Sequence, residues 1–147
     1  MPLSETSRNR SQTILRRALF ANAAFSTFSA AECLLAPEAV SRFVGLPVAE
    51  VRGIGIDLAL FVGLLLFAAT RKDLGTRAMR WVTGSIIAMD ALWVVGSAVF
   101  LMVPNPLTTA GVWTVGLVAL AVAELAGFQA YGWWGLRSTP VPAAATA

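Results

Sequence analysis

Four long apolar segments dominate the sequence, and each of them contains one acidic residue in a predominantly nonpolar stretch. The predicted segments cover residues 13–36, 48–70, 80–103 and 107–136, with the second beginning somewhere between 48 and 53. Their acidic residues are Glu32, Asp57, Asp90 and Glu124. Each segment is close to the roughly 20 residues that an α-helix needs to cross about 30 Å of hydrocarbon. The pattern predicts an all-α polytopic membrane protein, a four-transmembrane-helix bundle.

The composition supports this fold class and excludes several kinds of site. Charged residues make up 13% of the chain, about half the share of an average soluble domain. The chain has no histidine and a single cysteine, which excludes histidine-ligated haem, most zinc sites and an intrachain disulfide. We therefore expect no cofactor and no metal. Nucleic-acid binding is not expected either, because the basic residues cluster at the predicted helix ends.

The segment boundaries predict three parts of the chain. Residues 1–12 would form a cytoplasmic N-terminal segment, residues 13–137 the transmembrane domain, and residues 138–147 a disordered cytoplasmic tail rich in Pro, Ala and Thr. The arginines before the first apolar run also resemble the start of a signal peptide. Polar residues such as Asn22 and Ser26 interrupt that run, so a retained first helix is the better interpretation.

The distribution of Lys and Arg predicts the orientation. Nine of them fall on one side of the predicted bundle: Arg8, Arg10, Arg16, Arg17, Arg71, Lys72, Arg77, Arg80 and Arg137. Only Arg42 and Arg52 fall on the other side. By the positive-inside rule, both termini should lie in the cytoplasm of a cell whose inner membrane holds the protein.

The first outer loop has its own helix signals. Pro37 suits a helix start, and Gly45 followed by Pro47 suits a stop. Val40 and Phe43 would share one face. We expect a short helix in the outer membrane interface, with an irregular loop as the alternative.

The four acids are predicted to form a polar layer. Counting from the basic helix ends places them at heights of roughly 15–22 Å, in the middle to outer half of the hydrocarbon. Placing a charged acid there costs about 2.5–3.5 kcal/mol of insertion free energy. An acid inside a membrane helix is therefore treated as a candidate functional residue. We expect at least three of the four to point into the bundle, and Asp90 and Glu124 to approach each other. The candidate residues for binding a ligand or proton are Glu32, Asp57, Asp90, Glu124, Asn22, Ser29, Trp93 and Tyr131.

Neutralisation of these acids leaves two interpretations open. Arg52, near the outer edge, could reach Asp57 or Glu32, but no Lys or Arg lies at the depth of Asp90 and Glu124. The acids could bind a proton, a cation or a polar ligand. Alternatively, they could only join helices through hydrogen bonds. No catalytic residue is assigned.

The last segment carries Ala119, Ala123 and Gly127 at four-residue spacing. Small residues permit close approach of helices in a membrane. We expect this face to pack on another helix of the bundle or on a second copy of the chain. The expected partners are therefore the bilayer and, as open possibilities, a homo-oligomer or a larger membrane complex.

Several short stretches resemble a group of small bacterial four-helix membrane proteins. They are 19-LFANA-23, 34-LLAP-37, 45-GLP-47 and 90-DALWVVGS-97. The resemblance covers about residues 15–136 and implies a fold and a membrane location, but no activity. The chain is more distantly similar to DoxX-like proteins in size and helix number.

Three function classes follow from these observations. The first is a protein that binds or transports a proton, a cation or a small lipophilic ligand at the intramembrane acids. The second is an accessory or structural subunit of a membrane complex. The third is a membrane enzyme that uses paired carboxyl groups as acid and base.

Overall fold

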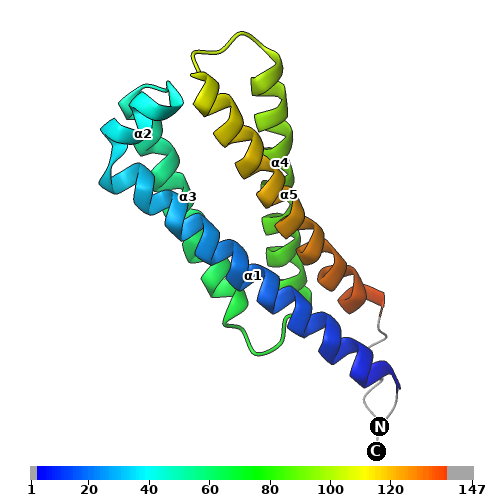
Figure 1. Cartoon of the computed structure of the whole chain (residues 1–147). Helices are drawn as coiled ribbons and strands as arrows, with labels where there is room; N and C mark the ends of the chain where they lie inside the picture. The colour runs from blue at the N-terminus through cyan, green and yellow to red at the C-terminus, as the bar shows by residue number, and fades with distance from the viewer. Residues whose placement is uncertain (1–2, 139–147) are drawn as a thin grey trace, which may run out of the picture.

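The computed structural model describes residues 3–138 and is helical, with no strand in that range (Figure 1). The five helices are α1 (Leu3–Leu35), α2 (Pro37–Val44), α3 (Val48–Ala69), α4 (Arg77–Met102) and α5 (Thr109–Ser138). The all-α fold class and the four long helices are confirmed. Ser138 is the last residue of α5, and the rest of the predicted tail, residues 139–147, lies outside the described part of the chain.

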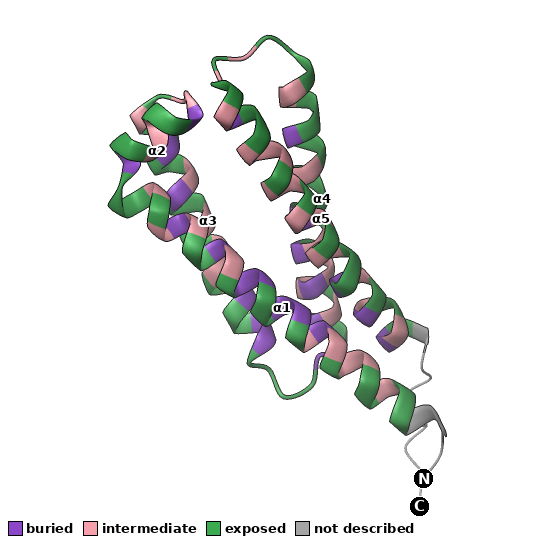
Figure 2. Ribbon diagram, viewed as in Figure 1, coloured by how far each residue is buried: buried purple, intermediate pink, exposed green. Residues whose placement is uncertain are grey.

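Four of these helices are long and apolar enough to cross a membrane: Thr6–Leu35, Val48–Ala69, Arg77–Met102 and Thr109–Arg137. Large apolar side chains cover the outside of the bundle, and Figure 2 shows how much of each helix is exposed. Leu60 and Leu92, for example, are 71% and 72% exposed. Such a surface suits a hydrocarbon solvent, and with the four spans it indicates a multi-pass membrane protein.

The long helices pack as two pairs. α1 runs along α3 and also crosses α5, while α4 packs on α5 and has little contact with α3. The α3–α4 connection lies at the end of the bundle where α1 begins, and α2 lies at the other end with the α4–α5 connection (Figure 1). The apolar core belongs to the half nearest the α3–α4 connection, and it includes Leu15, Leu19, Leu65, Leu74, Ile86 and Leu136.

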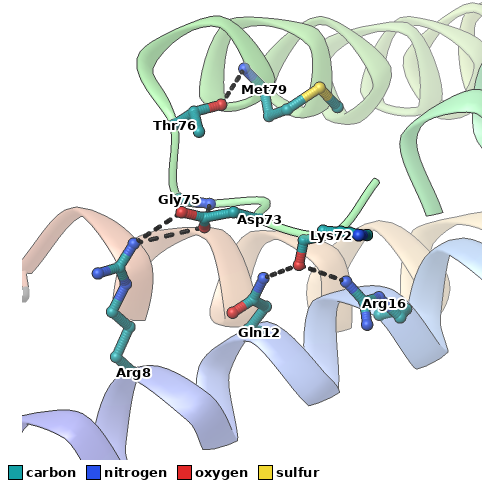
Figure 3. Close-up of polar contacts among 8 residues, drawn as sticks. All are labelled: Arg8, Gln12, Arg16, Lys72, Asp73, Gly75, Thr76 and Met79. Carbon is teal, nitrogen blue, oxygen red and sulfur yellow. Dashed lines mark hydrogen bonds and ion pairs between the residues drawn. The ribbon is translucent and has the colours of Figure 1, made fainter. Parts of the chain in front are cut away.

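α1 begins about three turns earlier than its apolar pattern predicts. Its first turns carry polar side chains that hold the α3–α4 connection (Figure 3). Arg8 forms an ion pair with Asp73 at 3.1 Å, and Gln12 Nε2 donates to the carbonyl of Lys72 at 2.9 Å. Arg16 donates to the same carbonyl at 3.0 Å. Residues 3–12 are therefore part of a helix that docks on a loop, which an apolar-periodicity argument does not detect.

At the opposite end, the predicted short helix is confirmed as α2 (Pro37–Val44), and its place in the membrane interface stays a prediction. Gly45 ends α2 with φ of 96°, a left-handed conformation that glycine adopts at little cost. The last turn of α2 is bound to the start of α5, because Thr108 donates from its backbone N–H to Val44 O at 2.9 Å and from its hydroxyl to Phe43 O at 2.5 Å. These bonds connect the α1–α3 pair to α5 at this end.

A close backbone approach between α5 and α1 lies away from the predicted face. Gly127 has no neighbour within 4 Å of where a Cβ would stand, so its part of the face is open within this chain. A Cβ at Gly132 would instead lie 2.8 Å from the backbone nitrogen of Leu15 on α1. Gly127 therefore has no close neighbour within the described chain, and packing of this face on a second copy stays a prediction.

Candidate functional site

Asp90 lies at the centre of a buried polar cluster. It is only 3% exposed, and its Oδ2 accepts hydrogen bonds from Asn22 Nδ2 at 2.8 Å and from Gln129 Nε2 at 3.0 Å. Ser26 Oγ in turn donates to Asn22 Oδ1 at 3.2 Å. Both amides bind the same carboxyl oxygen, which leaves Oδ1 without a donor among the described residues.

The cluster joins three helices through side chains. Asn22 and Ser26 lie one turn apart on the same face of α1, Asp90 comes from α4, and Gln129 comes from α5. Buried polar groups in a membrane must find their partners inside the protein, so these residues turn toward one another. α4 has no close backbone contact with α1, and the Asn22–Asp90 hydrogen bond spans the space between them.

A cavity of about 200 Å³ lies beside this cluster. All four long helices contribute to its wall, which consists of Phe25, Ser26, Ser29, Ile54, Asp57, Leu58, Phe61, Met89, Asp90, Trp93, Val118 and Val122. Most of this lining is apolar. The polar part comes from two carboxyl groups, two hydroxyl groups and the indole of Trp93, so the cavity combines a lipophilic wall with two acids.

Four predicted candidates meet at this site. Asp90, Asp57, Ser29 and Trp93 all line the cavity. A fifth candidate, Asn22, does not line it but donates a hydrogen bond to Asp90. Asp57 lines the cavity and is also exposed, so the cavity is open to the outside of the bundle at this residue. The carboxyl group that shares the cavity with Asp90 is therefore that of Asp57.

The other three candidates lie elsewhere. Glu32, Glu124 and Tyr131 are exposed and do not line the cavity. The expectation that at least three acids point into the bundle is therefore wrong, and the expected pairing of Asp90 with Glu124 is not formed at the cavity. Glu32 lies within one turn of the end of α1, where a side chain can reach the polar interface.

Glu124 was misassigned because height along a helix does not fix direction around it. The buried residues of α5 include Val122, Gln129 and Leu136, seven residues apart, and this row forms the inner face. Gln129 follows Glu124 by five residues, which turns it by about 140° around the helix axis. Gln129 was missed, although an amide within an apolar segment was a visible signal for a polar inner face.

The possible ion pair of Arg52 with Asp57 or Glu32 is not formed. Arg52 forms an ion pair with Glu38 of α2 at 2.9 Å. Both side chains are 57% exposed, so this pair belongs to the surface at the α2 end of the bundle. The two carboxyl groups at the cavity have no ion pair with any described Lys or Arg.

The arrangement offers negative charge and hydrogen-bond acceptors to a small guest. Gln129 Oε1 is buried and has no hydrogen-bond partner among the described residues, but Gln129 does not line the cavity. Within residues 3–138 no group of three or more His, Cys, Asp or Glu side chains is placed to hold a metal ion. Comparison of the chain with protein-family models, curated proteins and solved structures found no match.

Proposed function

We propose that this membrane protein binds a small lipophilic ligand with a positively charged or hydrogen-bond-donating end in the cavity between its two helix pairs. The observation that carries the proposal is that Asp57 and Asp90 line one largely apolar cavity. An apolar wall with a few polar groups is the usual composition of a small-molecule site. The carboxyl groups would orient the polar end, and the wall would hold the remainder.

The aromatic lining supports a cationic guest. Phe25, Phe61 and Trp93 contribute to the same wall as the carboxyl groups, and a ring face attracts a cation by about 0.5–2 kcal/mol, most strongly when water is excluded. Asp90 is already oriented by Asn22 and Gln129. A preoriented side chain loses less conformational freedom when the ligand binds, which strengthens binding.

Binding of a small lipophilic cation should depend on both cavity acids. We expect the purified chain to bind benzyltrimethylammonium, and Asp57→Asn or Asp90→Asn to weaken that binding at least about tenfold, because each substitution removes a carboxylate that attracts the cation and tenfold corresponds to only about 1.4 kcal/mol. Equilibrium dialysis in a zwitterionic detergent would measure the dissociation constant. The neutral isostere neopentylbenzene should bind more weakly and should not distinguish the variants.

Two exposed acids provide matched controls for this experiment. Glu32→Gln and Glu124→Gln remove the same charge from the same apolar region, but neither residue lines the cavity. Both variants should bind the cation as the parent does. The proposal would be contradicted if all four variants lost the same affinity for the cation. It would also be contradicted if the parent bound the cation and its neutral isostere equally well.

We further propose that the protein lies in the inner membrane with both termini in the cytoplasm. The support is that the nine Lys and Arg residues of the predicted inner side belong to the end of the bundle where α1 begins, α3 meets α4 and α5 ends. Positive charge favours the cytoplasmic side of a membrane. The end with α2 has only Arg42 and Arg52.

Single-cysteine labelling in intact cells would test this orientation. In a Cys33→Ala background, a cysteine at Ala39 of α2 should react with a membrane-impermeant maleimide. Cysteines at Ser7 or Ser138 should react only after the cells are permeabilised. Labelling of Ser7→Cys or Ser138→Cys in intact cells would show that the orientation is reversed.

A second candidate function rests on the same pair of carboxyl groups. Asp57 and Asp90 could act as acid and base on a lipophilic substrate, since they line one cavity and come from different helices. Proton transfer requires hydrogen-bond reach to the reacting group. In that case benzyltrimethylammonium would act as an inhibitor, and conversion of a substrate would be lost in either Asp→Asn variant.

A further inference from the structure

A second concave site lies at the end of the bundle where α4 begins and α5 ends, separate from the acidic cavity. This basic groove, of about 690 Å³, is lined on α4 by Arg77, Arg80, Trp81 and Ala88, and on α5 by Trp133 and Arg137, among others. None of these residues lines the cavity at Asp90. The groove therefore has to be explained independently of the proposed function.

The three arginines of the basic groove have no acidic partner in the described part of the chain. The ion pairs found there are Arg8–Asp73 and Arg52–Glu38. The first turn of α4 contains no acid, although it begins at Arg77 and the N-terminal end of a helix disfavours positive charge. An anion in the groove would interact favourably with the arginines and with this helix end.

The groove has a defined shape because its two helices are fixed to each other. Trp133 Nε1 donates to the carbonyl of Arg80 at 2.8 Å, and the Arg137 guanidinium stacks over the Trp133 ring at 4.6 Å from its centre. The contacts hold the Arg137 guanidinium on α5 close to the backbone of Arg80 on α4. A restricted side chain such as Arg137 binds an anion at a lower entropic cost than a freely mobile one.

The groove continues from the arginines into the apolar part of α4. Gly84 and Ala88 line it one and two turns beyond Arg80; the Trp133 ring packs against Gly84, and Ala88 is an exposed small residue. Trp81, 71% exposed, lies next to the arginines, as tryptophans do at the level of lipid headgroups. A basic head region followed by an apolar channel matches an amphiphile with an anionic head and a hydrocarbon chain.

We propose that the basic groove is a binding site for an anionic phospholipid of the surrounding leaflet. Arg77, Arg80 and Arg137 would contact the phosphate of the headgroup, and an acyl chain would lie along Gly84 and Ala88. Basic pockets between transmembrane helices bind anionic headgroups in this way. The apolar extension distinguishes this ligand from a soluble anion, which would need only the arginines.

The test uses the full chain in a zwitterionic detergent and titrates phosphatidylglycerol, with phosphatidylcholine as the comparison, while native mass spectrometry counts bound lipid. The parent should bind phosphatidylglycerol at least about tenfold more tightly than phosphatidylcholine. The triple variant Arg77→Gln/Arg80→Gln/Arg137→Gln should lose most of that preference, since each basic residue near the headgroup contributes favourably.

A matched control removes the same charge outside the groove. Arg10→Gln/Arg17→Gln/Lys72→Gln alters three exposed basic residues belonging to the same end of the bundle, and it should keep the preference. Ala88→Leu leaves the charge unchanged but narrows the apolar channel, so it should weaken lipid binding. Inorganic phosphate at equal concentration should not displace the lipid.

Three results would overturn the proposal. Equal losses in the two triple variants would mean that overall charge, and not the groove, attracts the lipid. Displacement by inorganic phosphate, with Ala88→Leu unchanged, would assign the arginines to a free anion. No preference for phosphatidylglycerol in the parent would exclude the site. A circular dichroism spectrum equal to that of the parent would establish that each variant is folded.

Discussion

Asp90→Ala is expected to destabilise the bundle by about 2–4 kcal/mol, because it leaves two buried amide groups without their acceptor and each unsatisfied buried donor costs roughly 1–3 kcal/mol. Asp90 accepts from Asn22 and Gln129 and is 3% exposed. Its removal also opens a gap at the point where α1, α4 and α5 meet. Unfolding in mixed micelles of increasing sodium dodecyl sulfate fraction would measure the loss of free energy.

Two substitutions separate this effect from a general effect of removing charge. Asp90→Asn retains an oxygen that can accept from either amide, so it should cost less than about 1 kcal/mol. Glu124→Ala removes an exposed acid that lies outside the cluster and should leave the unfolding free energy nearly unchanged. If Asp90→Ala and Glu124→Ala behaved alike, the buried cluster would not be a stabilising centre.

Gly132→Val is expected to destabilise the protein by about 2–3 kcal/mol, because α1 and α5 are in near-contact at this glycine. A Cβ there would lie 2.8 Å from the nitrogen and 3.0 Å from the Cα of Leu15. Backbone atoms cannot move aside as a flexible side chain can, so the helices must separate. Overpacking of a tight contact typically costs 1–3 kcal/mol, and the two further methyl groups of valine place this site toward the upper end.

Gly127→Val is the matched control on the same helix. The substitution is chemically identical, but no atom lies within 4 Å of the Cβ position at Gly127. Its effect should therefore stay within about 0.5 kcal/mol of zero, as expected from helix propensity alone. Unfolding in mixed micelles would compare the two variants. Equal losses of unfolding free energy would show that the α1–α5 crossing at Gly132 is not a tight contact.

Much of the fold could be predicted from the sequence because membrane insertion is decided segment by segment. A run of apolar residues needs only its own length and composition to form a spanning helix. Pro37, Gly45 and Pro47 likewise predicted α2 through local backbone preferences, and α2 spans Pro37–Val44. The start of α1 at Leu3 could not be found in this way, since its polar first turns are stabilised by contacts with a loop about 60 residues further along the chain.

The sequence by itself determined that the chain forms four apolar helices, because solvation and helix length depend only on residues within each segment. It also showed that each helix contains an acid. Tertiary structure decided which polar groups face inward. Asp90 meets Asn22 and Gln129, Asp57 shares its cavity, and Glu124 is exposed. That choice depends on the rotation of each helix about its axis. The rotation is set by contacts between distant residues, such as Gly132 against Leu15, and these contacts leave no periodic signal in a single segment.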